Sequence, residues 1–463
     1  MLRRILIANR GEIACRIIRA AQALDIETIA IFSEADANSL HRELADIAVP
    51  IGPAPAPQSY LCAENVLLVA RQYGADAVHP GYGFLSENSA FARAITAAGM
   101  AWIGPAPNTI DEMGDKARAR QIAVESDVPV LPGSDRLCAG MPAQWAEAAR
   151  MVGFPLLVKA VGGGGGIGMK RCDGPEGLQA TVESAQALAM KAFGQAEVYL
   201  ERYVEQARHV EIQVFGYGDG SAVHLFEREC SVQRRFQKII EESPAPNLPA
   251  PVLERMSAAA VALARRQRYS GAGTVEFIVD ALSHEFFFLE MNTRIQVEHA
   301  VTEAITGWDL VQEQIRLAAG LAVRRGQADV RRAGAAIECR LYAENPARQF
   351  LPSPGPLKHF RLPKATENLR IDCGVREGDT VTSFYDPMIA KLIARGADRT
   401  RALDTMREAL AAVEIDGIRH NAAFLQSVLA HPAFVAGAVD TGFVTREHAI
   451  LVRTMTAGTG AGL

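Results

Sequence analysis

The sequence predicts a multidomain protein of mixed α/β and α+β structure. The chain has 463 residues, which suggests about three domains at roughly 150 residues each. Near the N-terminus, apolar runs alternate with helical stretches, a pattern typical of a parallel sheet with crossover helices. Further along the chain, polar and apolar residues alternate over several segments, which predicts strands with one buried face.

Composition and charge exclude several classes of protein. Apolar residues make up 49% of the chain and charged residues 22%, which fits a globular protein with a sizeable core. The formal net charge is −5 and the chain has no long basic run, so no nucleic-acid partner is expected. No run of about 18 apolar residues occurs, so no membrane span is expected. The seven scattered cysteines form no C-x-x-C pair, which favours reduced thiols in the cytoplasm.

The first domain is expected over residues 1–115. Two apolar runs, 5–8 and 28–32, enclose the stretch 13–24, whose apolar residues recur at helical spacing. The turn at 9–12 reads NRGE and lacks the G-x-G-x-x-G of a dinucleotide site. A nicotinamide-dependent oxidoreductase is therefore disfavoured, and failure to bind NAD(H) would discard it.

A smaller unit is expected over residues 130–204, where it suits a hinged lid. Two predicted strands, 156–159 and 169–172, flank the glycine run 162–168. The run formally matches G-x-G-x-x-G, but a strand follows it rather than a helix, and no G-K-[ST] of a P-loop is present. Two interpretations remain open. The loop closes its backbone N–H groups over phosphates, with Lys159 reaching a phosphate, or it is a plain surface hairpin.

Residues 273–292 predict a hairpin that brings two carboxylates together. If Asp280 pairs with Phe286, the same register places Glu276 opposite Glu290. Facing carboxylates repel each other at a cost of up to about 1 kcal/mol. A divalent cation would reverse that penalty, whereas a one-residue slip in register would break the argument.

Asn292 extends the predicted metal site, because it shares a strand face with Glu290. Two carboxylates and an amide oxygen are ligands suited to Mg²⁺, or Mn²⁺ in its place. The alternative is an exposed polar face of the sheet. If the chain stays extended, Arg294, Gln296 and Glu298 continue the same row. Arg294 would then hold an anionic substrate and Glu298 would act as a general base.

Two other segments concentrate polar side chains. His209, Glu211 and Gln213 share one face of an alternating strand, and the stretch from Gln233 to Lys238 is rich in hydrogen-bond donors. A solvated surface is the ordinary explanation for each. Both belong to a third unit, expected over 205–330 as the body that carries the metal and anion site. A fourth unit is expected over 331–447, followed by a disordered tail over 448–463, which ends in a glycine-rich stretch.

Several motifs together resemble biotin carboxylases of the ATP-grasp superfamily over residues 1–447. The most specific is LEMNTRIQVEHAVTE at 289–303. The others are NRGEIACRIIRA, HPGYGFLSEN, GDK, FPLLVKA with the glycine run, and ECSVQRRFQK. The resemblance implies a Rossmann-like pre-ATP-grasp N-terminal domain, an ATP-grasp lid and body, and a C-terminal biotin carboxylase domain.

The resemblance also implies roles for individual residues. ATP would be bound by Lys116, Lys159, Gly165, Gly166, Glu201, Val204, His209, Gln233 and Glu276. The metal ligands would be Glu276, Glu290 and Asn292. Bicarbonate would be bound by Lys238, Arg294, Gln296 and Val297, with Glu298 as general base and Arg340 beside the biotin ureido group. The residues with catalytic roles would be Lys238, Arg294, Glu298 and Arg340.

The implied activity is ATP-dependent carboxylation of biotin by bicarbonate, through carboxyphosphate, with biotin carried by a separate carrier protein. Carboxyltransferase subunits and a homodimer are further expectations. An acetyl-CoA carboxylase or a related acyl-CoA carboxylase is the expected assembly. A urea, propionyl-CoA or methylcrotonyl-CoA enzyme, another ATP-grasp ligase, and a catalytically silent nucleotide-binding regulator are the alternatives.

One position departs from the family pattern. Phe236 stands in QRRFQK, where many relatives have His or another polar residue. A phenyl ring cannot accept or donate a conventional hydrogen bond. We therefore predict that Phe236 changes nucleotide affinity without abolishing turnover.

Overall fold

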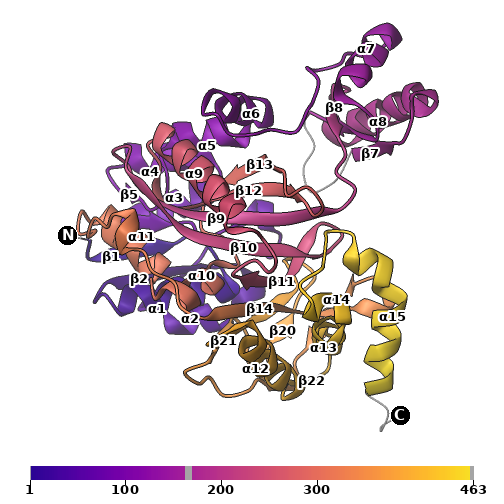
Figure 1. The fold of residues 1–463 in the computed structure, drawn as a ribbon. Helices are drawn as coiled ribbons and strands as arrows, with labels where there is room; N and C mark the ends of the chain where they lie inside the picture. The colour runs from indigo at the N-terminus through magenta and orange to yellow at the C-terminus, as the bar shows by residue number, and fades with distance from the viewer. Residues whose placement is uncertain (1, 162–168, 459–463) are drawn as a thin grey trace.

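The computed structural model describes residues 2–161 and 169–458 (Figure 1). A five-stranded parallel sheet in the order β3-β2-β1-β4-β5 begins the chain, as the strand and helix alternation predicts. Its strands are β1 (Arg4–Ile7), β2 (Glu27–Phe32), β3 (Ile47–Pro50), β4 (Ala77–His79) and β5 (Ala101–Trp102). Its helices are α1 (Gly11–Gln22), α2 (Leu40–Leu44), α3 (Ala63–Gln72) and α4 (Ser89–Ala97). Buried apolar clusters cover both of its faces, as a parallel sheet requires.

Two helices lead from this domain to the unit predicted as a lid. They are α5 (Pro107–Gly114) and α6 (Lys116–Glu125). The Asp115 side chain accepts hydrogen bonds from the backbone N–H groups of Ala117 and Arg118, both at 2.9 Å, and so caps α6. The cap places Lys116 at the first residue of the helix.

The lid unit has its own small sheet and core. Strands β6 (Leu156–Ala160), β7 (Met169–Cys172) and β8 (Val198–Arg202) form an antiparallel sheet in the order β7-β6-β8. Helices α7 (Pro142–Val152) and α8 (Leu178–Phe193) pack around Trp145, Val158 and Leu200 in a separate apolar cluster. In Figure 1 this unit stands away from the rest of the molecule.

A single eight-stranded sheet forms the centre of the remaining chain, in the order β13-β12-β9-β10-β11-β14-β21-β19. The body contributes β9 (Ala207–Tyr217), β10 (Ala222–Arg234), β11 (Gln237–Ser243), β12 (Ser270–Asp280) and β13 (Phe286–Asn292). It also contributes helices α9 (Ala250–Arg266), α10 (His299–Thr306) and α11 (Leu310–Ala318). The C-terminal part contributes β14 (Ala335–Tyr342), β19 (Leu369–Cys373) and β21 (Met388–Gly396). Because β11 pairs with β14, the sheet runs unbroken across residue 330, where sequence alone separates two units.

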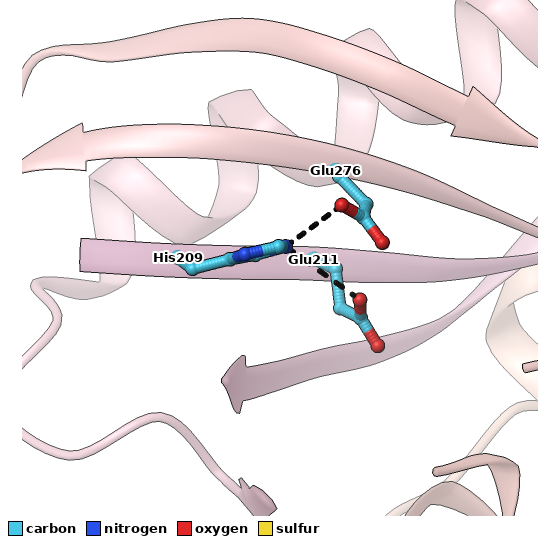
Figure 2. A group of neighbouring side chains, drawn as sticks. All are labelled: His209, Glu211 and Glu276. Carbon is cyan, nitrogen blue, oxygen red and sulfur yellow. Dashed lines mark ion pairs between the residues drawn. The ribbon is translucent and has the colours of Figure 1, made fainter. Parts of the chain in front are cut away.

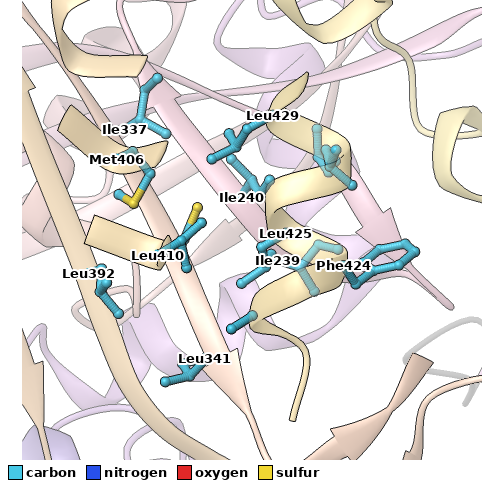
Figure 3. Packing of buried hydrophobic residues seen from close by; sticks show 14 of the residues in the cluster. Ile239, Ile240, Ile337, Leu341, Leu392, Met406, Leu410, Phe424, Leu425 and Leu429 are labelled. Atoms are coloured by element: carbon cyan, nitrogen blue, oxygen red, sulfur yellow. The ribbon is translucent and has the colours of Figure 1, made fainter. Parts of the chain in front are cut away.

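The largest apolar cluster also crosses that boundary. Ile239 and Ile240 of β11 pack with Ile337, Leu341 and Leu392 beneath helices from the C-terminal region (Figure 3). The helices are α12 (Arg399–Ala411), α13 (Ala422–Ala430), α14 (Pro432–Val435) and α15 (Phe443–Gly458). The short strands are β15 (Glu344–Asn345), β16 (Leu351–Pro352), β17 (Gly355–Pro356), β18 (His359–Arg361), β20 (Thr380–Val381) and β22 (Glu414–Asp416). The body and the C-terminal region therefore share one sheet and one core.

The C-terminal segment differs from the expected disordered tail. Helix α15 continues to Gly458, because Phe443, Val444 and Leu451 are buried in the same cluster. Residues 459–463 lie outside the described part of the chain. Among the described residues, the helices are all too short or too polar to cross a membrane.

Candidate functional site

The hairpin of β12 and β13 brings the predicted carboxylates face to face. Glu276 pairs with Glu290 in the register of the sheet, as predicted. The predicted pairing of Asp280 with Phe286 is wrong, because Val279 is the partner of Phe286. The register shifts by one residue between Glu276 and Phe277. One extra residue in β13 forms a β-bulge at this shift. Glu276 therefore still lies opposite Glu290, although the pairs beyond the bulge differ from the prediction.

Most of the predicted site residues line one cavity of about 670 Å³. It lies over the central sheet and is also bordered by the N-terminal domain. The predicted residues that line it are His209, Lys238, Glu276, Glu290, Asn292, Arg294, Gln296, Val297, Glu298 and Arg340.

The polar row beyond Asn292 is not an extended strand. Strand β13 ends at Asn292, and Glu298 has φ −84° and ψ 14° immediately before α10. The sequence predicts one row of Arg294, Gln296 and Glu298 only if the chain stays extended, and it does not stay extended here. Their side chains still border the same cavity, because this segment of the chain turns beside it.

Glu298 is buried between two cations. Its Oε1 accepts a hydrogen bond from Lys238 Nζ at 2.7 Å, and its Oε2 accepts one from Arg340 at 2.9 Å. Burial opposes ionisation of this carboxyl, but the charges of Lys238 and Arg340 hold its pKa well below the usual range. Glu298 is therefore ionised at neutral pH, which is the form that a general base requires.

Lys238 is shared among three carboxylates. Besides Glu298, its Nζ donates to Glu211 at 2.6 Å and to Glu276 at 2.9 Å. Burial would lower the pKa of Lys238, but these carboxylates raise it well above its ordinary value. The lysine is thus held as a fixed cation at the floor of the cavity.

The facing carboxylates have opposite tendencies to ionise. Burial disfavours the charged form of Glu276, but Lys238 and His209 lower the pKa of this carboxyl below its ordinary value. Burial and the charge of Glu276 raise the pKa of Glu290. Lys238 and His209 favour the charged form of Glu276, and a divalent cation between the two carboxylates would favour ionisation of both. Glu276, Glu290 and Asn292 thus fit a hard cation such as Mg²⁺.

Arg294 is clamped along one edge of the cavity. Its guanidinium donates to Glu87 at 2.9 Å, Asn292 Oδ1 at 2.8 Å and Gln296 Oε1 at 2.6 Å. The Gln296 amide in turn donates to Glu276 at 2.9 Å. These contacts hold the guanidinium in place as a second cation for an anionic ligand.

His209 lies beside Glu276 and Glu211 (Figure 2). Its Nε2 lies 2.9 Å from Glu276 Oε2 and 3.9 Å from Glu211 Oε2. Its Nδ1 lies 2.8 Å from the Gln233 amide nitrogen, so that Gln233 fixes the ring from behind. The solvated strand face that pattern alone would favour is excluded for His209, Glu211 and Gln213, because all three are buried.

The predicted phosphate-binding lysines line a second cavity, of about 1100 Å³, beneath the lid. Lys116, Lys159 and Glu201 border it, and Glu290 lines both cavities. Lys159 forms an ion pair with Glu201 on the neighbouring strand β8. A nucleotide bound there would reach the paired carboxylates through Glu290.

Some predicted residues lie elsewhere. Gly165 and Gly166 fall outside the described residues. Val204 is half-buried in the segment between β8 and β9. It is not among the described residues that line the two cavities. Gln233 pairs with Lys238 in the sheet, and its side-chain amide lies beside His209. Phe236 lies at the rim of the first cavity with an exposed side chain.

Sequence reasoning missed the residues that support the site from behind. Arg228 is fully buried and donates to Glu211 at 2.6 Å, and Glu241 accepts a hydrogen bond from Arg340 at 2.7 Å. Tyr82 also lines the cavity. Only Tyr82 had a signal in the sequence, its place in the HPGYGFLSEN motif. The sequence of an alternating strand does not show which distant residue a charged side chain will contact.

Comparison with family models divides the chain into three matched regions. Residues 1–110 match the model "Biotin carboxylase, N-terminal domain". Residues 115–325 match "Carbamoyl-phosphate synthase L chain, ATP binding domain", and residues 338–446 match "Biotin carboxylase C-terminal domain".

Curated relatives are subunits of acyl-CoA carboxylases. The chain is 48% identical to the mitochondrial methylcrotonoyl-CoA carboxylase subunit alpha of Dictyostelium discoideum over 441 residues, which is 95% of this chain and 63% of that protein. It is 45% identical to the propionyl-CoA carboxylase alpha chain of Ruegeria pomeroyi over 467 residues, which is 97% of this chain and 68% of that protein. The chain therefore spans somewhat under two thirds of the methylcrotonoyl-CoA relative.

Solved structures agree with the fold over nearly the whole chain. The biotin carboxylase domain of Hydrogenobacter thermophilus 2-oxoglutarate carboxylase, in complex with MgADP, ADP and bicarbonate, has a TM-score of 0.91 and 41% identity. The match covers 97% of this chain and 99% of that one. Campylobacter jejuni biotin carboxylase, in complex with β-γ-ATP, has a TM-score of 0.91 and 39% identity, with coverage of 96% and 99%.

Proposed function

The chain belongs to the biotin carboxylase family of ATP-grasp ligases, and we propose that it carboxylates N1′ of carrier-borne biotin with bicarbonate and ATP. One observation carries the proposal. The ionised Glu298 lies between Lys238 and Arg340, in the same cavity as the facing pair Glu276 and Glu290. Base, cations and metal ligands thus meet at one place.

Bicarbonate activation would begin at Glu298. Lys238 and Arg294 hold the anion, and Glu298 removes its proton. The oxygen so freed attacks the γ-phosphorus of ATP, whose bond to the β-phosphate oxygen breaks to give carboxyphosphate and ADP. The two cations offset the negative charge that gathers as this bond forms.

The second stage would take place at Arg340. Carboxyphosphate breaks into CO₂ and phosphate, and the phosphate takes the N1′ proton of biotin. Arg340 would stabilise the negative charge on the ureido oxygen, and N1′ then forms a bond to the carbon of CO₂. Because Arg340 and Glu298 are in contact, the two stages share one set of charges.

ATP and Mg²⁺ are the nucleotide and metal of this chemistry, and MgADP is bound in the Hydrogenobacter relative. Glu276, Glu290 and Asn292 would hold the cation. When bound, it offsets charge on the nucleotide phosphates. Lys116 and Lys159 line the larger cavity and would hold the remaining phosphates.

The carboxyl acceptor is proposed to be an acyl-CoA of the methylcrotonoyl or propionyl type. The expected assignment to acetyl-CoA carboxylase finds no support among these relatives, which are methylcrotonoyl-CoA and propionyl-CoA carboxylase subunits. Isolation of the chain with its bound partners, followed by incorporation of labelled bicarbonate into each of the three acyl-CoAs, tests this. Preferential labelling of acetyl-CoA would overturn it.

The proposed partners are a biotin carrier, carboxyltransferase subunits and a second copy of the chain. The Hydrogenobacter relative is described as a dimer, which supports a homodimer here. A cytoplasmic site of action is supported by the seven cysteines, all of which are free thiols. Light scattering would test the dimer.

The half-reaction is tested by ADP release from the purified chain with Mg-ATP, with bicarbonate and free biotin each omitted in turn. We expect release to require bicarbonate and to rise with biotin. Bicarbonate-dependent release that is indifferent to biotin would support carboxyphosphate formation and count against free biotin as acceptor. Release without bicarbonate dependence would refute the proposed activity.

A further inference from the structure

A buried lysine joins three parts of the molecule behind the cavity. Lys391 of β21 is completely buried, and its Nζ donates a hydrogen bond to the backbone carbonyl of Val297 at 2.6 Å. The same Nζ lies 3.2 Å from Glu12 Oε1, at the start of α1. One ammonium group thus connects the C-terminal sheet, the segment after β13 and the N-terminal domain.

The glutamate extends this connection to Tyr82, a residue of the N-terminal domain. The Tyr82 hydroxyl donates to Glu12 Oε2 at 2.5 Å, and Tyr82, Glu12 and Val297 all line the cavity. We call this chain of contacts, Tyr82–Glu12–Lys391–Val297, the strut. Val297 is among the residues expected to bind bicarbonate, whereas Tyr82, Glu12 and Lys391 are assigned no role in the reaction proposed above.

The backbone is packed tightly where the strut crosses between domains. A Cβ atom placed on Gly374 would lie 2.3 Å from the backbone nitrogen of Glu12. Only glycine therefore allows the end of β19 to approach the start of α1 this closely. The Glu12 side chain is thereby held at a defined position relative to β21, which pairs with β19.

The contact with Val297 controls the geometry of the reactive segment. A carbonyl held by an ammonium group fixes the orientation of the peptide that joins Val297 to Glu298. That peptide sets the direction in which the Glu298 side chain leaves the backbone. Buried ion pairs contribute little net stability compared with apolar replacements, so a role beyond stability is the better explanation for these charges.

We propose that Glu12 and Lys391 are positioning residues that hold the Val297–Glu298 backbone in register with Tyr82 across the cavity. The effect on turnover rests on the proposed biotin carboxylase activity, whereas the effect on the backbone does not. Bicarbonate would be received by the Val297–Glu298 end of the strut, and the wall formed by Tyr82 would face the second substrate.

The test compares Glu12→Gln and Lys391→Met with Asp372→Asn. Asp372 is buried, and its Oδ2 lies 3.8 Å from Lys391 Nζ. It is not among the described residues that line the cavity. The first readout is hydrogen–deuterium exchange of residues 293–299 in the folded protein. We expect faster exchange there in Glu12→Gln and Lys391→Met, and no change in Asp372→Asn.

The second readout is the Michaelis constant of each substrate. We expect Lys391→Met to raise the KM for bicarbonate about tenfold or more, because small displacements of a reacting group have large kinetic effects. The KM for ATP should stay within about twofold, since no residue of the strut is among the described residues that line the nucleotide cavity. Glu12→Gln, which keeps the side-chain shape, should show the same pattern more weakly and serves if Lys391→Met does not fold.

The outcomes separate the two proposals. Unchanged exchange over residues 293–299, or equal effects in Asp372→Asn, would overturn the positioning role. A parallel rise in the KM values for ATP and bicarbonate would also overturn it, because that indicates general loss of structure. Absence of bicarbonate-dependent ADP release in the unaltered protein would refute the proposed function, and the exchange data would still decide the role of the strut.

Discussion

The two cavities of the site hold their charges in different ways. Around Glu298, buried carboxylates and cations come from β9, β11 and β14, which belong to one continuous sheet, and each is bonded to partners on other elements. Beneath the lid, Lys159 has its partner Glu201 on the neighbouring strand of the same small sheet. The body thus distributes its charges across the fold, whereas the lid pairs its charges within itself.

This difference separates stability from function. A charge removed from the cluster around Glu298 leaves other buried charges without partners, so we expect stability and activity to fall together. A charge removed from the lid disturbs one local pair, so nucleotide binding is lost while the fold is kept. The predictions below test this contrast from the largest expected effect to the smallest.

Lys238→Met should have the largest effect. It leaves Glu211, Glu276 and Glu298 without their shared cation, so we expect a loss of about 3–5 kcal/mol in the free energy of unfolding. Bicarbonate-dependent ADP release should fall about 100- to 1,000-fold. Urea unfolding and steady-state kinetics measure the two effects. An unfolding free energy equal to that of the unaltered protein would contradict the proposed difference between body and lid.

Lys159→Met should affect the nucleotide more than the fold. Both side chains of the Lys159–Glu201 pair are 13% exposed, and we expect a loss of only about 1–2 kcal/mol in unfolding free energy. The KM for ATP should rise about tenfold or more. Lys170→Met, on the adjacent strand, is the matched control, since Lys170 does not border the nucleotide cavity in its described lining. A destabilisation as large as that of Lys238→Met would contradict the prediction.

Glu241 should make the stability of the body depend on pH. Burial raises the pKa of Glu241 to about 7, despite the neighbouring Arg340. A carboxyl whose folded pKa exceeds its unfolded value stabilises the protein at low pH, and this contribution is lost as pH rises through the folded pKa. Glu241→Gln should therefore reduce the fall in unfolding free energy between about pH 5 and pH 8, by about 1–3 kcal/mol. Denaturant titrations across that range measure it, and identical pH slopes in both proteins would count against it.

Phe236→His should have the smallest effect on stability. Arg235 and Phe236 both have positive φ, 47° and 66°, at the β10–β11 turn, and the Phe236 side chain is 67% exposed. Such a surface change should alter the unfolding free energy by less than about 0.5 kcal/mol. We expect the KM for ATP to change about two- to tenfold, with turnover retained. An unchanged KM for ATP would refute a role of Phe236 in nucleotide affinity.

The hairpin of β12 and β13 shows how far sequence reasoning reached. The place of the hairpin at 273–292 followed from the residue pattern, and the pairing of Glu276 with Glu290 followed from their spacing. The bulge next to this pair could not be predicted, because the residues around it are all compatible with a regular strand. The correct pairing therefore came with an incorrect partner for Phe286.

The C-terminal tail and the domain boundary near residue 330 were harder to predict. Residues 448–458 lead into a glycine-rich end and were predicted to be disordered, yet they continue α15, because Phe443, Val444 and Leu451 meet a core built by distant strands. Likewise, the break expected near residue 330 is bridged by the pairing of β11 with β14. Local patterns carry no information about which distant surface a segment meets.

The sequence by itself determined the order of elements, the facing carboxylates and the family resemblance, because each depends on residue types at short spacing. Only the tertiary structure decided how the charges are paired. Arg228, Glu241 and Lys391 support the site through partners that come from other strands and another domain. The physical reason is that a buried charge is stable only beside its partner, and the fold alone selects that partner.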